Sequence, residues 1–319
     1  MRSSISASEA GPLIYLKALA AFCVLFVTGV EILFSHPVKE YSATYRRVSR
    51  QYAEALHARP SRTGEPVSVL MVGNSLLLEG VDLPRLREST SRSLRIYPIF
   101  LEYTTYYDWE YALRRLFREG ARPQVVVVGL GPDSLIEDKV RAEYSPLLLF
   151  DTGDVLDVSA DLGLDRSATT NLLVAHWSTF WDMRGVFRAQ ILRHMIPYAE
   201  DLVTLVRLKR TVRFAPDSEP KAIRRLQTLR TLVEGYGARL ILLIPPTPAS
   251  ECEVRHTVMV AQKVGVETLV PIDPVTLSAS FYQPDAIHLN SQGATRFTSA
   301  LVANLPRRIT AGEIATLPD

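Results

Sequence analysis

The stretch VSVLMVGNSLLLEGVD, residues 67 to 82, joins a predominantly apolar run to a leucine-rich segment through Gly73, Asn74 and Ser75. A short apolar run bounded by turn residues is typical of a strand that is buried on both faces of a parallel sheet. Ser75 either turns the chain after this strand or is a nucleophile held at the end of the strand. The sequence around it does not choose between these two readings, but the rest of the chain does.

Beyond this stretch, apolar strands alternate with amphipathic helices. We expect strands at 67–72, 95–101, 124–130, 239–245 and 267–272, and helices at about 83–93, 108–119, 219–236, 250–264 and 291–305. The unbroken valines of the third strand suit a position covered on both faces. This alternation predicts an α/β fold, a flavodoxin-like three-layer sandwich around a five-stranded parallel sheet.

The sandwich is expected to occupy residues 66–310, followed by a C-terminal tail at 311–319. Residues 138–218 fit no strand–helix unit, so we expect a helical insertion after the third strand. We expect the insertion to pack as a subdomain on the edge of the sheet. A lid, a membrane-surface element and a docking face for a partner remain functional alternatives for it.

An apolar segment, PLIYLKALAAFCVLFVTGVEILF, covers residues 12–34 and is interrupted only by Lys17 and Glu31. As a helix it would extend about 34 Å, enough to cross a bilayer core of about 30 Å. We interpret it as a transmembrane signal anchor between an N-terminal tail, 1–11, and a juxtamembrane helix and linker, 35–65. A cleaved signal peptide and a buried helix of a soluble protein are the alternatives.

The composition excludes several functions. A net charge of +2 from 36 basic and 34 acidic residues, without a long block of one sign, argues against nucleic acid as a partner. Two cysteines, Cys23 and Cys252, assemble neither a disulfide framework nor a thiolate metal site. The histidines at positions 36, 57, 176, 194 and 256 show no metal-ligand spacing, so we predict no metal and no cofactor.

A second polar pattern lies near the end of the chain, in FYQPDAIHLNSQG, residues 281–293. Asp285 and His288 are three positions apart, and a turn can bring the carboxylate onto one ring nitrogen and leave the other free to take a proton. Loops at the carboxyl ends of parallel strands gather at one edge of the sheet, so Ser75 and His288 can meet. The sequence therefore predicts a Ser–His–Asp triad.

These two motifs, Gly73-Asn74-Ser75 after the first strand and Asp285-Ala-Ile-His288-Leu before the last helix, resemble the SGNH (GDSL) hydrolase superfamily. The likeness covers residues 66 to about 305 apart from the insertion. It implies that Ser75 is the nucleophile, His288 the general base and Asp285 its orienting partner. Members of the superfamily hydrolyse or transfer acyl groups on lipids, small esters and carbohydrates, without a metal or organic cofactor.

Two other motifs of that superfamily are poorly matched here. The segment after the second strand, LEYTTYYDWEY, lacks the glycine that helps to bind the oxyanion, and GLGPDSL after the third strand lacks the usual asparagine. Candidate oxyanion or substrate contacts in this chain are Asn74, Thr105, Gly131 and Asp133. The residues Tyr106, Tyr107 and Trp109 either offer aromatic faces to a sugar or pack in the core.

The N-terminal anchor, the divergent motifs and the insertion resemble a membrane-anchored SGNH-like branch that works in the O-acylation of envelope polymers beside a membrane O-acyltransferase. The resemblance implies a single-pass protein of a bacterial-type inner membrane, with its domain on the periplasmic side, although the count of positive charges does not favour that orientation. A secreted form after signal cleavage is the alternative.

The expected function is that of a serine-dependent acyl ester hydrolase or O-acyltransferase acting on an acylated envelope glycan. A catalytically weak or inactive scaffold that partners an O-acyltransferase is the main alternative, and a lipase or thioesterase is a further one. Losing one oxyanion donor typically slows a hydrolase by about 100- to 1000-fold, which favours weak activity.

Overall fold

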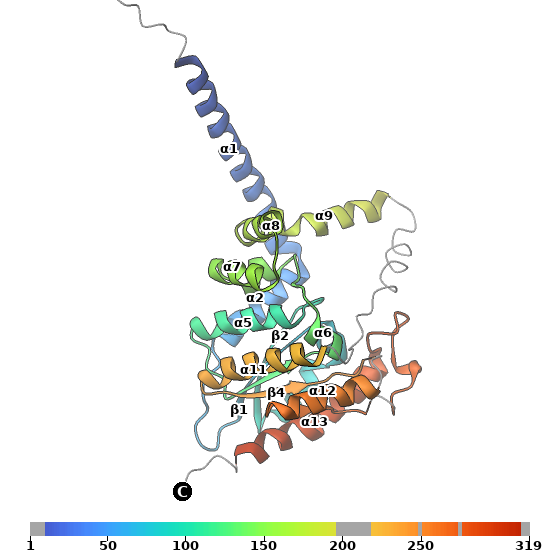
Figure 1. Ribbon diagram of the computed structural model, residues 1–319. Helices are drawn as coiled ribbons and strands as arrows, with labels where there is room; N and C mark the ends of the chain where they lie inside the picture. The colour runs from blue at the N-terminus through green and yellow to red at the C-terminus, as the bar shows by residue number, and fades with distance from the viewer. Residues whose placement is uncertain (1–9, 196–217, 248–250, 274–275, 314–319) are drawn as a thin grey trace, which may run out of the picture.

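The centre of the molecule is a five-stranded sheet in the order β2-β1-β3-β4-β5, in which every neighbouring pair is parallel. The computed structural model describes residues 10–195, 218–247, 251–273 and 276–313 (Figure 1). The strands are β1 (Val67–Gly73), β2 (Leu94–Phe100), β3 (Val125–Gly129), β4 (Arg239–Leu243) and β5 (Glu267–Leu269). This order is that of flavodoxin-like folds, and it confirms the predicted fold class.

Helices cover both faces of this sheet and make it the middle of three layers (Figure 1). On one face, Leu70 and Val72 of β1 pack in a core with α5 (Tyr106–Arg118), α11 (Glu219–Gly235) and α12 (Glu251–Lys263). On the other, Val69 and Met71 pack with α3 (Ser75–Gly80), α4 (Leu83–Thr90) and α13 (Ser291–Glu313). Successive side chains of a strand point to opposite faces, so one apolar strand supplies both cores.

The last strand and the last helix differ in length from the prediction. β5 is three residues long, whereas the sequence ETLVPI predicted a strand over 267–272. α13 continues through Pro306 to Glu313, whereas the prediction ended before that proline and placed a tail from 311 onward. A proline inside a helix removes one donor without necessarily ending the helix when the buried face continues, as it does at Ile309.

The segment predicted as a juxtamembrane helix and linker contributes to the core. Helix α2 (Ala43–Ala55) begins after Ser42, whose hydroxyl accepts a hydrogen bond from Tyr45 N at 3.1 Å. Its residues Val48 and Ala55 are fully buried, and the Gln51 side chain accepts a hydrogen bond from Phe100 N of the edge strand β2 at 3.1 Å. The packed core therefore includes residues before position 66.

Between β3 and α11 the described chain is helical. Its elements are α6 (Pro132–Ile136), the π-helix η1 (Ser145–Leu149), α7 (Thr152–Asp161), α8 (Arg166–Trp177) and α9 (Thr179–Met195). Phe150, Val155 and Val158 are fully buried in the same core as α5. The remainder of the predicted insertion, 196–217, lies outside the described residues.

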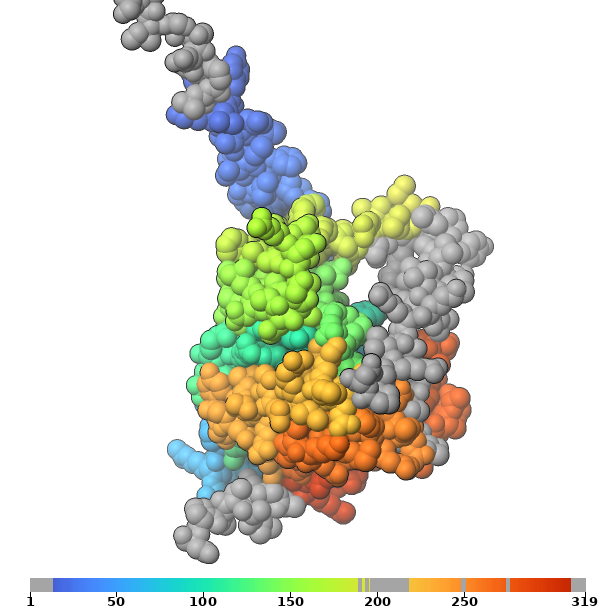
Figure 2. All heavy atoms as spheres, in the orientation of Figure 1, coloured from blue at the N-terminus to red at the C-terminus, as the bar shows by residue number. Residues whose placement is uncertain are grey.

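The apolar N-terminal segment is one long helix, α1 (Ala10–Tyr41), which projects from the folded domain (Figures 1 and 2). The part from Ile14 to Tyr41 has a mean hydropathy of 2.2 over its most apolar window, none of which is buried. This exposure does not fit a buried helix of a soluble core. Length and composition are those of a membrane anchor or a signal sequence.

Candidate active site

Ser75 lies where β1 ends and α3 begins. Asn74 caps α3, because its side-chain oxygen accepts a hydrogen bond from Leu76 N at 3.1 Å. Ser75 is therefore the first helical residue, and its side chain is half-buried at the carboxyl edge of the sheet. The site lies beside β1 and β3, where the order of the strands reverses, which is the usual place for ligands in such a sheet.

Two glycines allow α3 to lie close against the strand ends. Gly73 pairs with Gly129 of β3. A Cβ atom on Gly73 would lie 2.7 Å from both the Gly129 oxygen and Leu77 Cδ1. A Cβ on Gly129 would meet the same Leu77 side chain. Because Gly73 and Gly129 have no side chains, Leu77 of α3 packs directly against the ends of β1 and β3. This packing fixes the position of Ser75.

His288 and Asp285 reach this serine from the loop that precedes α13. Nε2 of His288 lies 2.8 Å from Ser75 Oγ, and Nδ1 lies 2.6 Å from Asp285 Oδ2. The other carboxylate oxygen, Oδ1, accepts hydrogen bonds from Ile287 N at 2.9 Å and from His288 N at 3.0 Å. The structure brings all three residues of the predicted triad together in the predicted order.

The electrostatics of Asp285 define the tautomer of the ring. Burial raises the pKa of this carboxyl, but hydrogen bonds from the His288 ring and from the amides of His288 and Ile287 outweigh burial and hold the pKa below its ordinary value. An ionised carboxylate only accepts hydrogen bonds, so Nδ1 of His288 donates to it. Nε2 of the neutral ring is then left with a lone pair for the Ser75 hydroxyl.

Asn290 holds the loop that carries Asp285 and His288. Its Nδ2 donates to the carbonyl of Ser280 at 2.7 Å and to that of Tyr282 at 3.2 Å, while its Oδ1 accepts from Gly293 N at 3.0 Å in the first turn of α13. Asn290 is not among the site residues predicted from the sequence. Its place just before a predicted helix is a typical capping position and was the available signal.

Asn74 positions the loops around Ser75 and has no hydrogen left for an oxyanion. Its Nδ2 donates to the carbonyl of Thr104 at 3.3 Å and to Ser134 Oγ at 3.2 Å. Because Ser134 accepts from Asn74, its own hydroxyl proton is available to another acceptor. Asn74 therefore links the loops after β1, β2 and β3 on the same edge of the sheet.

Two backbone amides at this edge are candidate oxyanion donors. The first amides of a helix have no partner within the helix, and the amide of Ser75 is one of these. Within the described part of the chain neither Ser75 N nor Gly131 N donates a hydrogen bond. Gly131 lies against α3, since a Cβ atom there would be 3.5 Å from Leu76 Cδ1.

Thr105 is engaged elsewhere in the structure. Its amide donates a hydrogen bond to the carboxylate of Asp108 at 2.8 Å, and its hydroxyl donates to the carbonyl of Lys139 at 2.7 Å. These bonds cap α5 and fasten the loop after α6 to the capped turn. Thr105 thus has a structural use that leaves no free donor for an oxyanion.

Asp133 lies in the first turn of α6, next to Ser134. Burial, together with repulsion from the nearby Glu253 and Glu137, raises the pKa of this carboxyl to about 6. When ionised, such a group opposes a developing oxyanion and accepts a hydrogen bond from a hydroxyl. Asp133 suits contact with a substrate hydroxyl better than oxyanion stabilisation.

The aromatic residues after β2 differ in burial. Tyr106 and Trp109 are buried in the core, where Arg225 stacks on Tyr106 at 4.8 Å. Core packing, one of the two expectations for them, is what the structure shows. The exposed aromatic of this segment is Tyr103, 53% exposed, with a backbone φ of +62°. Positive φ at a bulky residue is unusual and concentrates at functional sites.

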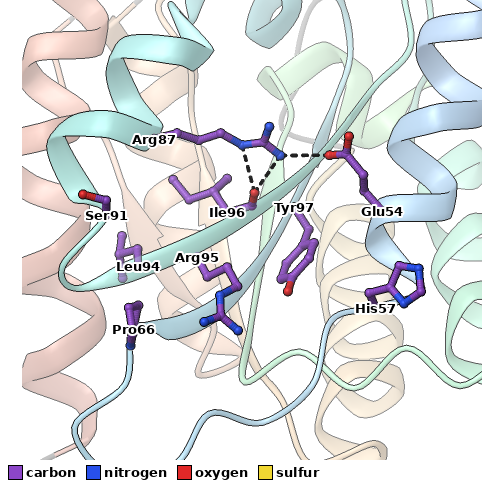
Figure 3. A pocket seen from close by; sticks show the side chains of 9 residues that line it. All are labelled: Glu54, His57, Pro66, Arg87, Ser91, Leu94, Arg95, Ile96 and Tyr97. Carbon is purple, nitrogen blue, oxygen red and sulfur yellow. Dashed lines mark hydrogen bonds and ion pairs between the residues drawn. The ribbon is translucent and has the colours of Figure 1, made fainter.

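A separate cavity of about 450 Å³ lies around the first residues of β2 (Figure 3). It is at the amino ends of the strands, whereas the triad is at their carboxyl ends. Arg87 crosses it, bonded to Glu54 at 3.1 Å and to the carbonyl of Ile96. Its cation is thus already paired, and the cavity is not part of the triad. Among the residues that the structure describes, no group of three His, Cys, Asp or Glu side chains could hold a metal ion.

Comparisons with known proteins give no family. No protein-family model and no curated protein matches the chain. Among solved structures, TesA is similar over 75% of this chain and 98% of its own, with 13% identity and a TM-score of 0.40. A catalytic mutant of Axe2, an acetylxylan esterase from Geobacillus stearothermophilus, is similar over 75% of this chain and 94% of its own, with 13% identity and a TM-score of 0.37.

Proposed function

We propose that this protein is a serine-dependent acyl ester hydrolase or O-acyltransferase. The observation that supports the proposal best is the unbroken hydrogen-bond chain from Ser75 Oγ through both nitrogens of His288 to Asp285, at 2.8 and 2.6 Å. A serine hydroxyl is a weak nucleophile unless an adjacent base takes its proton, and this chain supplies one. A serine that only turned the chain after β1 would not need a histidine oriented in this way.

The reaction follows from these roles. Ser75 Oγ attacks the acyl carbonyl carbon while its proton moves to His288 Nε2, and Asp285 stabilises the resulting imidazolium. The bond to the leaving alkoxide breaks as His288 passes that proton to the alkoxide oxygen, which leaves an acyl group on Ser75. Water or a sugar hydroxyl then attacks the acyl carbonyl and gives its proton to His288, which passes a proton to Ser75 Oγ as the bond between Oγ and the acyl group breaks.

Oxyanion stabilisation is assigned to Ser75 N and to one further donor, Gly131 N or the Ser134 hydroxyl. Preorganised donors of this kind act where charge develops in the transition state. The glycine and the asparagine that the SGNH motifs usually supply as further donors are absent here, which supports modest rather than high activity. Asp133 and the exposed Tyr103 are proposed as contacts to the substrate, through a hydroxyl and a sugar face respectively.

An acylated envelope glycan is the proposed substrate, and a membrane O-acyltransferase is the proposed partner. Helix α1 supports a membrane location, and the exposed Tyr103 and the Asp133 carboxyl, on loops that Asn74 links to the Ser75 loop, are groups of the kind that bind sugars. We place the catalytic domain on the periplasmic side of a bacterial-type inner membrane, with α1 as a single-pass anchor. A reporter fused after residue 65 tests this orientation, and a cytoplasmic reporter signal would overturn it.

The test of the activity is labelling by a fluorophosphonate probe, which modifies only an activated serine. We expect the full chain to be labelled and Ser75→Ala not to be. Ser91→Ala is the matched control, because Ser91 is an exposed serine at the end of α4, away from the triad. Labelling that persists in Ser75→Ala, or is absent from folded wild type, overturns the proposal.

The second candidate function is a non-catalytic scaffold for a membrane enzyme. It is favoured by one observation: the Asn74 amide, the side-chain donor next to the nucleophile, is fully used within the protein. Release of acetate or another acyl group from candidate glycans separates the two functions. Assays on esters and thioesters of graded chain length separate both from a lipase or thioesterase.

A further inference from the structure

The outer face of α9 carries basic and apolar side chains together. Arg184, Arg188, Ile191 and Met195 follow one another at intervals of four, three and four, which places them on one face of the helix. All four are exposed, Ile191 by 57% and Met195 by 73%. Leu192, also exposed, lies beside them. Arg184 stacks on Trp181 of the same helix at 4.4 Å and donates to its carbonyl. For the rest of this face no partner is seen among the described residues, and its apolar side chains are not those of a solvated helix.

The opposite face of α9 fastens the helix to the folded domain. Asp182 and Met183 are each 1% exposed, and Asp182 Oδ2 accepts a hydrogen bond from Tyr144 N at 2.9 Å. Asp182 lies on the opposite side of the helix from Ile191, nine positions further along, so the outer face points away from the domain. In Figure 2, α9 forms part of the end of the domain from which α1 projects.

The beginning of α9 is bound to the end of the apolar part of α1. Glu31 of α1 accepts hydrogen bonds from Ser178 Oγ at 2.7 Å and from Thr179 N at 2.8 Å, and so caps α9. Phe34 packs against Phe180 and Phe187 with ring centroids 4.9 and 5.2 Å apart. A carboxylate near the end of an apolar span is costly unless it is paired, and this contact pairs it.

These contacts fix the level of α9 relative to α1. The apolar stretch that starts at Ile14 ends about 30 Å further along, near Glu31 and Phe34, at 1.5 Å per residue. From this point α9 runs to the side, away from the end of α1 that meets the domain (Figure 1). Trp177, 71% exposed, ends the preceding helix at the same place.

We propose that the outer face of α9, together with Trp177, lies in the headgroup region of the membrane that α1 crosses. Exposed apolar side chains then enter the acyl boundary, arginines meet lipid phosphates, and the tryptophan occupies its preferred interfacial level. The proposal rests on α1 as a membrane anchor and is independent of catalysis. We favour lipid over a protein partner, because α9 is held at the level where the apolar span of α1 ends, and lipid headgroups surround the chain at that level.

The experiment measures the accessibility of nitroxide spin labels in the full chain, reconstituted in vesicles of phosphatidylethanolamine and phosphatidylglycerol. The two native cysteines are both exposed and serve as references. Cys23 lies in α1 and reports lipid when Cys252 is replaced by serine, and Cys252 in α12 reports water when Cys23 is replaced. Ile191→Cys and Met195→Cys, in a background without native cysteines, report α9.

We expect labels at 191 and 195 to show a several-fold higher ratio of oxygen to nickel-chelate collisions than the label at Cys252, approaching that at Cys23. Ratios at 191 and 195 equal to that at Cys252 overturn the proposal. Labels shielded from both reagents indicate a protein contact and overturn it as well, as does a water-exposed Cys23. Fluorophosphonate labelling of Ser75 in the same vesicles tests the catalytic proposal. Its failure can therefore be distinguished from failure of the membrane proposal, which the spin labels test.

Discussion

Nε2 of His288 lies 2.8 Å from the hydroxyl oxygen of Ser75, although 213 positions of the chain separate the two residues. The contact follows from topology, because β1 ends at the same edge of the sheet where the loop before α13 begins. Leu289, next to His288, is buried in the same core as Leu77 of α3. Burial of apolar neighbours on both sides therefore brings two polar side chains to hydrogen-bonding distance.

The first prediction concerns the triad as a unit. Ser75→Ala and His288→Ala are each expected to reduce kcat by about 10⁴- to 10⁶-fold, and the double variant to lose no more than the worse single one. Asp285→Asn is expected to cost about 10⁴-fold, because the amide can hold the ring in the wrong tautomer. Hydrolysis of a chromogenic ester by the purified variants measures this. Multiplicative losses in the double variant would contradict a shared role.

The parallel sheet and the meeting of Ser75 with His288 could be predicted from sequence, since both depend on local patterns combined with a topological rule. The valine run of β3 fixes a central strand, and the spacing of Asp285 and His288 is that of a turn. Neither requires knowledge of distant packing.

Other contacts depend on which distant surfaces meet, and for these the sequence carries no local signal. Glu31 was visible only as an interruption of an apolar run, and its partners Ser178 and Thr179 lie 147 and 148 positions away. In the same way, Trp109 and Tyr103 both follow β2, and only the arrangement of α5 decides that one is buried and the other exposed.

The second prediction concerns the close approach of α3 to the sheet. Gly73→Ala is expected to lower the free energy of unfolding by about 1–3 kcal/mol, because the added methyl overlaps the Gly129 carbonyl and Leu77. Displacement of α3 should also reduce fluorophosphonate labelling of Ser75. Gly235→Ala is the matched control, since nothing lies within 4 Å of a Cβ there. Urea unfolding in detergent measures the stability of both variants. Equal stability of Gly73→Ala and Gly235→Ala would contradict the packing argument.

The third prediction is a pH dependence of stability from Asp182. Burial raises the pKa of this carboxyl to about 8, and its Oδ1 has no hydrogen-bond partner among the residues that the structure describes. The unfolded group has an ordinary pKa near about 4, so the folded state binds the extra proton between these values. Stability from this group is full below about pH 4 and is lost as the pH rises towards 8, by at most about 1.4 kcal/mol per pH unit.

Asp182→Asn removes that proton and keeps an acceptor for Tyr144 N. The difference in unfolding free energy between wild type and this variant should therefore change in favour of the variant as the pH is raised from 5 to 8. Taking the difference cancels the titration of all other groups. A difference that is constant with pH would show that Asp182 is ionised throughout the range.

The fourth prediction separates two roles of Ser134. If its hydroxyl donates to the oxyanion, Ser134→Ala lowers kcat by about 100- to 1000-fold with little change in KM. If it only accepts the hydrogen bond from Asn74, the loss should remain below about tenfold, because Asn74 keeps its bond to the Thr104 carbonyl. Ser134→Thr retains the hydroxyl and is expected to recover most of the activity in the first case alone.

The last prediction concerns Tyr103. Its neighbour Thr104 accepts a hydrogen bond from Asn74, so the exposed ring lies close along the chain to the loops that surround Ser75. A ring that stacks on a sugar contributes to binding before and during the reaction alike. Tyr103→Ala should then raise KM for an acylated glycan about tenfold with kcat unchanged, whereas Tyr103→Phe should keep the wild-type KM. A small chromogenic ester, which has no sugar to stack, is the control substrate and should be hydrolysed equally by all three proteins. Equal loss on both substrates would mean that the ring supports the backbone at its positive φ and does not contact the glycan.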